Sequence, residues 1–122
     1  MKILIGTDIV EVDRIKENII KHENRFLSKI FTKAEIEYCE SKKVQKYQSY
    51  AVRFAANEAV YKALSTYIIG EYTWKDFEIL KTENGRPKVK IHFKIENLED
   101  IDVSLSHCKE YAVAYVMAKF KE

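Results

Sequence analysis

The sequence predicts an α+β protein in which helices from the first half of the chain wrap an antiparallel sheet from the second half. Three observations support this prediction. Residues 45–64 are rich in alanine and contain neither glycine nor proline, which favours a helix of several turns. Residues 74–80 and 89–95 alternate apolar and polar side chains, as half-buried strands do. The Asn84-Gly85 pair between these two segments is typical of a hairpin turn.

The remaining elements have shorter signals. Residues 3–5 form an apolar run that predicts a strand ending near Asp8, and a helix is expected to begin at residue 12 or 13. Thr32 and Glu35 have the spacing of a capping box, which predicts a second helix reaching about residue 42. Two more strands are expected at residues 103–106 and 111–117, and the first strand is expected to join the sheet.

The composition is that of one globular domain spanning residues 1–122. Hydrophobic residues make up 47% of the chain and charged residues 33%, and a second core would not fit in 122 residues. No apolar run approaches the roughly 20 residues that a membrane-spanning helix needs. The first residues lack an apolar stretch followed by a cleavage site, so we expect no signal peptide and a cytoplasmic location.

The charge and the rarer residue types argue against several function classes. A net charge of +2 is too small to indicate binding to nucleic acid. Cys39 and Cys108 form no Cys-x-x-Cys pair, so they are expected to be reduced thiols. The three histidines are scattered through the sequence, which argues against a zinc site.

Two acidic residues could hold a metal ion. Glu58 lies in the predicted long helix, with Phe54 one turn before it and Lys62 one turn after it on the same face. Asp8 follows Gly6 at the expected end of the first strand. Mg²⁺ favours few carboxylates together with substrate phosphates. The alternatives are a surface ion pair for Glu58 and Lys62 and a helix cap or turn for Asp8, and spacing alone does not show whether the two acids meet.

Two further positions could contact a ligand. The Asn84-Gly85 turn exposes backbone amides, although many hairpins share this pair. His107 lies at the end of a predicted strand, where it could bind a phosphate or act as a base. A single histidine is more often an ordinary hydrogen-bonded residue.

Five segments of the chain resemble the holo-acyl-carrier-protein synthase family, the small phosphopantetheinyl transferases of bacteria. They follow the order and the spacing of the family and together span nearly the whole chain: residues 6–15 (GTDIVEVDRI), 31–36 (FTKAEI), 53–63 (RFAANEAVYKA), 84–87 (NGRP) and 103–112 (VSLSHCKEYA). The resemblance implies the 4′-phosphopantetheinyl transferase-like fold. It also implies a homotrimer that binds coenzyme A in clefts between subunits.

The resemblance further implies an enzyme that moves 4′-phosphopantetheine from coenzyme A to a serine of apo-acyl carrier protein. The reaction releases 3′,5′-ADP and serves fatty acid and lipid biosynthesis. The resemblance places Asp8 and Glu58 on Mg²⁺ and Lys62 beside the phosphates as a third catalytic residue. The remaining coenzyme A contacts, partly from the neighbouring subunit, are Arg53, Asn84, Gly85, Arg86 and His107. A carboxylate or a metal-bound water could take the serine proton, and the sequence leaves this open.

The resemblance places the docking surface for acyl carrier protein, an acidic helical partner, at and after Arg14. Positive residues alternate with apolar ones in this part of the chain: Arg14, Lys21, Arg25 and Lys29. Such a pattern is also common on a solvated amphipathic face. We expect no membrane partner and no nucleic acid partner.

The chain departs from the family pattern at two places. Asn57 replaces the usual lysine before Glu58, and Ser65-Thr66-Tyr67 replaces Gly-Thr-Gly. We expect Asn57 to cost only an exposed contact with a phosphate. After the long helix we expect another backbone path, with the Tyr67 ring over part of the cleft.

Two other functions remain open, and the departures support only the first of them. One is a non-catalytic trimer that binds coenzyme A or carrier protein without turnover. The other is a hydrolase of nucleotide pyrophosphates that uses the same metal site. The retained Asp8, Glu58 and Lys62 count against the non-catalytic trimer.

Overall fold

The computed structural model describes residues 1–121, and its elements follow a simple order. Strand β1 (Lys2–Glu11) leads directly into a run of four helices: α1 (Val12–His22), α2 (Asn24–Ile30), α3 (Lys33–Glu40) and α4 (Lys46–Leu64). Four strands complete the order: β2 (Phe77–Lys81), β3 (Pro87–Ile91), β4 (Leu98–His107) and β5 (Tyr111–Phe120). The α+β class with antiparallel pairing is therefore confirmed.

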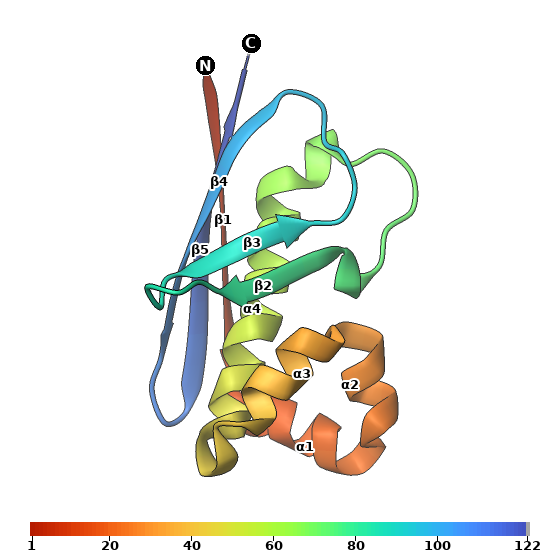
Figure 1. The fold of residues 1–122 in the computed structure, drawn as a ribbon, viewed down its shortest axis with the longest axis vertical. Coiled ribbons are helices and arrows are strands. Elements are labelled where there is room, and N and C mark those ends of the chain that lie inside the picture. Colours follow the sequence, from red (N-terminus) through yellow and green to blue (C-terminus); the bar gives the residue numbers. More distant parts are fainter. Residues whose placement is uncertain (122) are drawn as a thin grey trace.

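The strands form two sheets. The larger sheet has the order β1-β5-β4 with antiparallel neighbours, and β2 pairs with β3 in a separate hairpin whose strand β3 contacts β4. Lys2 lies opposite Phe120, so both ends of the chain lie together at one end of the large sheet. Figure 1 shows α1, α2 and α3 gathered at the other end. Helix α4 runs along one face of the large sheet and connects the two parts of the fold.

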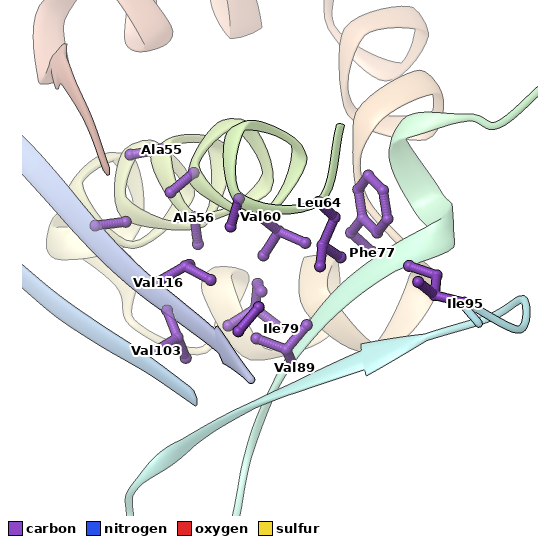
Figure 2. Packing of buried hydrophobic residues seen from close by; sticks show 14 of the residues in the cluster. Ala55, Ala56, Val60, Leu64, Phe77, Ile79, Val89, Ile95, Val103 and Val116 are labelled. Carbon is purple, nitrogen blue, oxygen red and sulfur yellow. The ribbon is translucent and has the colours of Figure 1, made fainter. Parts of the chain in front are cut away.

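The main core lies between α4 and the two sheets. Ala56 and Val60 of α4 point toward Val116 of the large sheet, and Ile79 and Val89 of the hairpin close the core from below (Figure 2). Because alanine side chains are short, the helix can approach the sheet closely. A second core joins the first half of α4 to α1, α2 and α3, and it is built from apolar residues such as Ile15, Ile19, Phe31 and Tyr50.

Gly6 marks the closest approach of β1 to α4. A Cβ atom at Gly6 would clash with the carbonyl oxygen of Ala59 and would lie 2.8 Å from the backbone nitrogen of Ala63. Any other residue would therefore push the strand and the helix apart. This contact holds Asp8, two residues further along β1, against the same stretch of α4.

The face of the large sheet away from α4 is apolar and exposed. Along β5 the buried residues alternate with exposed ones, and β1 follows the same alternation. In a sheet covered on one face, the residues that point outward are usually polar. Here the outward side chains include large apolar groups: Ile3, Ile5, Ile9, Tyr111, Val113 and Tyr115. We refer to these six residues as the outer sheet face. Within residues 1–121, no helix combines the length and apolar character needed to cross a membrane.

The predicted helix starts are confirmed, whereas several strand bounds are wrong. Thr32 and Glu35 form the predicted capping box of α3, which ends at Glu40, two residues early. Strand β1 does not end near Asp8 but continues to Glu11, because β5 pairs with it throughout. The strand expected at 74–80 begins only at Phe77.

Two more strand predictions need correction. A second capping box, at Thr73, turns residues 74–76 into a short 3-10 helix and delays the start of β2. The strand expected at 89–95 spans Pro87–Ile91. Strand β4 extends beyond both ends of the segment predicted for it, and β5 extends beyond the C-terminal end of its predicted segment.

The chain after α4 follows a new path, as expected. Ser65–Tyr67 form a 3-10 turn that prolongs the helix. The Tyr67 ring stacks on Phe120 with 4.0 Å between the ring centroids. The expectation that this ring covers the ligand cleft is therefore wrong, because the ring is held at the other end of the core.

Candidate functional site

The predicted catalytic residue Lys62 contacts the predicted metal ligand Asp8. The Nζ atom of Lys62 lies 3.1 Å from Oδ1 of Asp8 and donates a second hydrogen bond, of 3.0 Å, to the carbonyl oxygen of Thr7. Lys62 therefore pairs with Asp8 across the two elements, and Asp8 is not a helix cap. We refer to Asp8, Glu58 and Lys62 as the acidic corner.

The charges of the acidic corner act on one another. Partial burial raises the pKa of Glu58, the nearby charge of Asp8 raises it further, and Lys62 opposes both effects. Two carboxylates whose charges act on each other fit the preference of Mg²⁺ for few protein ligands. In residues 1–121 no cluster of three or more histidine, cysteine or acidic side chains could hold a metal alone. An ion here would take its other ligands from substrate and water.

The predicted coenzyme A contacts other than Lys62 line one cleft. The cleft has a volume of about 630 Å³ and lies between α3, α4, the β2–β3 hairpin and β4. Its lining contains every one of the following predicted residues: Arg53, Asn84, Gly85, Arg86 and His107. Lys42 and Lys81 also line it, although the sequence did not suggest them. We refer to this region as the basic cleft.

Three cations gather around the ring of Tyr38 in the basic cleft. The distances from the ring centroid are 4.3 Å to Cζ of Arg53, 4.8 Å to Nζ of Lys42 and 5.6 Å to Nζ of Lys81. Burial alone would raise the pKa of Tyr38, but a hydrogen bond with Lys42 and the three positive charges lower it overall. The ring therefore holds mutually repelling cations together through cation–π contacts.

Arg53 is nearly buried although it is charged, with 5% of its surface exposed. Its guanidinium donates to Oγ of Ser49 at 3.1 Å, while its Nε atom has no hydrogen-bond partner in the described chain. A buried donor without a partner is destabilising unless a ligand supplies an acceptor. Arg53 therefore has a hydrogen-bond donor that an anion in the cleft could satisfy.

The hairpin turn is fixed before any ligand binds. Oδ1 of Asn84 accepts a hydrogen bond from the backbone N–H of Arg86 at 3.0 Å, and Gly85 has a φ angle of 84° that favours glycine. The Arg86 guanidinium lies 2.6 Å from Oδ2 of Asp102 on β4. These contacts tie the turn to the large sheet.

A buried acidic network holds the hairpin to α3. Glu35 accepts hydrogen bonds from the backbone N–H of Thr32 and of Ile79, each at 2.9 Å, and burial raises its pKa. Glu78 accepts a hydrogen bond of 2.6 Å from the Thr32 hydroxyl and lies 2.8 Å from Nε2 of His92. Only the capping box hinted at this network from the sequence, since β2 supplies the other partners.

The acidic corner and the basic cleft lie on different sides of α4. Arg53 and Glu58 are five positions apart, which turns them about 140° around the helix axis. Glu58 is not among the residues that line the basic cleft. Within one chain, the predicted catalytic and coenzyme-binding residues therefore form two separate groups.

Asn57 differs from its sequence-based description. We expected an exposed position, but only 2% of its surface is exposed and its side chain is buried in α4. Nearby residues of α4 pack into the main core, and position 57 also faces the interior of the protein. The interpretation of Asn57 as a lost surface contact is wrong.

The four predicted partner contacts are exposed. Arg14 and Lys21 lie on α1, and Arg25 and Lys29 lie on α2. Arg25 and Lys29 line a shallow pocket together with Phe26, whose ring stacks on Phe54 of α4. The arrangement presents positive charge beside a partly exposed aromatic ring.

Comparison with known proteins gives a consistent result. The family model described as "4′-phosphopantetheinyl transferase superfamily" matches residues 4–116. A holo-[acyl-carrier-protein] synthase of Ruminiclostridium cellulolyticum is 51% identical, over 96% of this chain and 92% of the relative.

Solved structures agree with the sequence matches. The holo-[acyl-carrier-protein] synthase of Helicobacter pylori in complex with coenzyme A is 30% identical, with a TM-score of 0.81 over 95% of this chain and 100% of that chain. The corresponding Bacillus anthracis synthase in complex with CoA (3′,5′-ADP) is 32% identical, with a TM-score of 0.79 over 97% and 96% of the two chains.

Proposed function

The chain belongs to the 4′-phosphopantetheinyl transferase superfamily, as one of its holo-acyl-carrier-protein synthases, and from this premise we propose how its residues carry out the transfer. The reaction moves the phosphopantetheine group of coenzyme A to acyl carrier protein. One observation carries the proposal for the site: five residues from α4, the hairpin turn and β4 converge on one basic cleft.

The phosphoadenosine end of coenzyme A lies in the basic cleft under this proposal. Its phosphates are the most strongly charged part of the molecule, and guanidinium groups bind phosphate through paired hydrogen bonds. Arg53 offers a donor without a partner, and Arg86 and His107 line the opposite wall. Lys42 and Lys81 add positive charge, so the whole cleft favours an anion.

The acidic corner binds the pyrophosphate group whose bond is broken in the reaction. Asp8 and Glu58 would hold Mg²⁺, which neutralises charge on a phosphate leaving group when it is bound. Lys62 is half exposed on the same side of α4 and would turn from Asp8 to a phosphate oxygen. The serine hydroxyl of the carrier protein attacks the β-phosphorus and gives its proton to a carboxylate of the acidic corner or to a water molecule there. The new oxygen–phosphorus bond forms as the pyrophosphate bond breaks, and 3′,5′-ADP leaves.

The proposal includes assembly into a homotrimer. The outer sheet face exposes six large apolar side chains, and apolar patches of this kind usually mark an interface. The two halves of the site also lie on different sides of α4, so one coenzyme A cannot easily use both within a single chain. A neighbouring copy that brings its acidic corner to the basic cleft would complete the site.

Carrier protein docks on α1 and α2 in this proposal. Arg14, Lys21, Arg25 and Lys29 are exposed and positive, and the partner is acidic. Opposite charges speed the encounter of two proteins and lose effect as salt rises. The reaction takes place in the cytoplasm under the same proposal, and the free thiols of Cys39 and Cys108 suit a reducing compartment.

A transfer assay tests the function directly. Apo-carrier protein, coenzyme A and Mg²⁺ are incubated with the chain, and the mass of the carrier protein is measured. A mass increase equal to phosphopantetheine is expected. Binding of coenzyme A without a mass change would favour the non-catalytic trimer, and release of 3′,5′-ADP in the absence of carrier protein would favour the hydrolase.

A further inference from the structure

Glu35 is a buried carboxylate outside the acidic corner and the basic cleft. Only 1% of its surface is exposed, although charged side chains are rarely buried in proteins. Burial raises its pKa, while hydrogen bonds from the backbone of Ile79 and Thr32 and the positive charge of Arg53 oppose this effect. A buried charge is destabilising unless other groups compensate it. The two backbone donors and Arg53 together supply that compensation.

The hydrogen bond from Ile79 joins Glu35 to the hairpin. Within residues 1–121, β2 and β3 form a two-stranded sheet, so one edge of β2 faces away from β3. At this edge the N–H of Ile79 donates to Oε2 of Glu35 at 2.9 Å. The Oε1 atom accepts from the N–H of Thr32, at the start of α3. The carboxylate therefore bridges α3 and β2, and we refer to these two hydrogen bonds as the Glu35 bridge.

The two bridged elements also carry two groups of the basic cleft. Tyr38 follows Glu35 by one helical turn on α3, and Lys81 is the last residue of β2. The Nζ atom of Lys81 lies 5.6 Å from the centroid of the Tyr38 ring. Helix α3 and strand β2 contact each other along this stretch. The Glu35 bridge therefore fixes the separation of the two elements next to the contact between Tyr38 and Lys81.

We propose that Glu35 is a positioning residue for coenzyme A: its carboxylate holds β2 against α3, so that Lys81 stays among the cations of the basic cleft. This inference rests on the proposed function. In the described chain Glu35 is not among the residues that line the cleft, so it acts through Lys81 and not on the ligand. Lys81 is exposed, and its long side chain can adopt many rotamers. Its ammonium therefore meets a phosphate in the cleft only while β2 keeps its place.

The Glu35 bridge requires a carboxylate. Each carboxylate oxygen accepts one backbone N–H, whereas the amide of glutamine has one accepting oxygen and an NH₂ group that can only donate. In Glu35→Gln this NH₂ group would face the N–H of either Thr32 or Ile79. The bond to Thr32 is local and belongs to the capping box of α3, so the bond to β2 is the one that we expect to be lost.

The affinity for 3′,5′-ADP, measured by calorimetry, tests the inference. Glu35→Gln should weaken binding about fivefold, as expected for the loss of one exposed contact between an ammonium and a phosphate. The KM for coenzyme A should rise by a similar factor. The kcat at saturating coenzyme A should stay near its natural value, because the acidic corner is unchanged. Glu37→Gln removes an exposed carboxylate from the same helix and is the matched control, which should leave these constants unchanged.

A double-mutant cycle separates positioning from a general effect on the fold. Lys81→Ala alone should weaken 3′,5′-ADP binding about fivefold. If Glu35 acts through Lys81, adding Glu35→Gln to Lys81→Ala causes no further loss. Independent effects would multiply to about twenty-five-fold and would overturn the inference. Natural affinity in Glu35→Gln, or a fall in kcat as large as the rise in KM, would overturn it as well.

A second pair of variants applies if Glu35→Gln does not fold. The hydroxyl of Thr32 donates to Glu78 of β2 at 2.6 Å, which gives α3 and β2 a second link beside the Glu35 bridge. Thr32→Val keeps the shape of the side chain and removes this link, whereas Thr32→Ser keeps the hydroxyl. Thr32→Val should bind 3′,5′-ADP more weakly than Thr32→Ser does. Equal affinities of the two variants would contradict the inference.

The outcomes separate this inference from the proposed function. If the natural chain transfers phosphopantetheine while the variants bind 3′,5′-ADP as tightly as the natural chain does, only the inference fails. If the natural chain binds neither coenzyme A nor 3′,5′-ADP, the proposed function and the inference both fail.

Discussion

The basic cleft and the acidic corner are built in different ways. In the basic cleft nearly every charged group is already held: Arg53 lies against Tyr38, Arg86 is paired with Asp102, and the hairpin turn is hydrogen-bonded. The acidic corner has two carboxylates near each other and one half-exposed lysine. The charged groups of the cleft are thus held in place by the protein, whereas in the corner Lys62 pairs with Asp8 and no hydrogen bond holds Glu58 in the described chain.

The placement of the two regions adds a second lesson. A helix such as α4 can position residues for two sites, because residues five positions apart face different directions. In the trimer that we propose, a long substrate would link one side of the helix in one copy to the other side in the next copy. We therefore predict the effects of substitutions that disturb each region, or the contact between copies, one at a time.

The largest effect is expected from charge on the outer sheet face. Ile5→Asp places a carboxylate among apolar side chains that we propose to be buried between copies. Light scattering should then give the 14.4 kDa of one chain in place of three times that mass, and transfer should fall to background. Ile69→Asp, at a loop position that is 90% exposed, is the control and should stay trimeric. A fully active monomer would reject the shared site.

Loss of a carboxylate in the acidic corner should come next. Asp8→Asn and Glu58→Gln keep the shape of the side chain and remove a charge that, in our proposal, holds Mg²⁺. Loss of one such electrostatic contact typically slows a reaction by about a hundredfold or more. Glu96→Gln, on an exposed residue, should be neutral. The basic cleft is untouched, so 3′,5′-ADP should bind as in the natural chain. Natural rates at saturating Mg²⁺ would refute the metal assignment.

A smaller effect is expected at the docking surface. Arg14→Glu reverses one exposed charge on α1 and should raise the KM for carrier protein about tenfold at low salt. The KM for coenzyme A should stay nearly unchanged, because Arg14 does not line the basic cleft. The difference should shrink as salt is added. An equal rise in both constants would mean that Arg14 serves the coenzyme site or the fold.

The smallest effect concerns the anchoring of the basic cleft. Burial would raise the pKa of Glu78, but hydrogen bonds from Thr32 and His92 hold it below its usual value. A carboxyl group whose pKa is lower in the folded state stabilises the fold at pH values above its pKa in the unfolded chain, near 4.5. This contribution is lost as the pH falls through the pKa of the folded state.

Glu78→Gln should therefore lower the free energy of unfolding by about 1–2 kcal/mol at pH 7. Chemical denaturation at several pH values measures this difference, which should shrink as the pH falls below 4.5 and vanish below the pKa of Glu78 in the folded state. A difference that is constant with pH would show that the charge of Glu78 is not responsible. Transfer should be reduced only slightly, since the hairpin keeps its contact between Arg86 and Asp102.

Local signals in the sequence predicted α1, α3, α4 and the hairpin turn, but not the short helix α2. Thr32 and Glu35 form their capping box within one turn, and Asn84-Gly85 sets the turn without help from distant residues. The length of β1 could not be predicted in this way, because pairing with β5 carries the strand past Asp8. The burial of Asn57 also depends on distant elements that close over α4.

The candidate site was predicted unevenly for the same reason. The family resemblance supplied the residues of the acidic corner and five residues of the basic cleft. It did not supply the group of cations around Tyr38, because Lys42 and Lys81 come from different elements and meet only in the fold. The Glu35 bridge was missed as well, since Ile79 lies 44 positions further along the chain and meets Glu35 only in the fold.

Complementation between two inactive variants tests the shared site most directly. One variant, Asp8→Asn, keeps its basic cleft, and the other, Arg86→Glu with His107→Ala, keeps its acidic corner. Each should be inactive alone. When the two are refolded together in equal amounts, about a quarter of the natural activity should return, because each shared site draws its two halves at random. No recovery at any mixing ratio would contradict the account, because it would mean that both halves of the site belong to one chain.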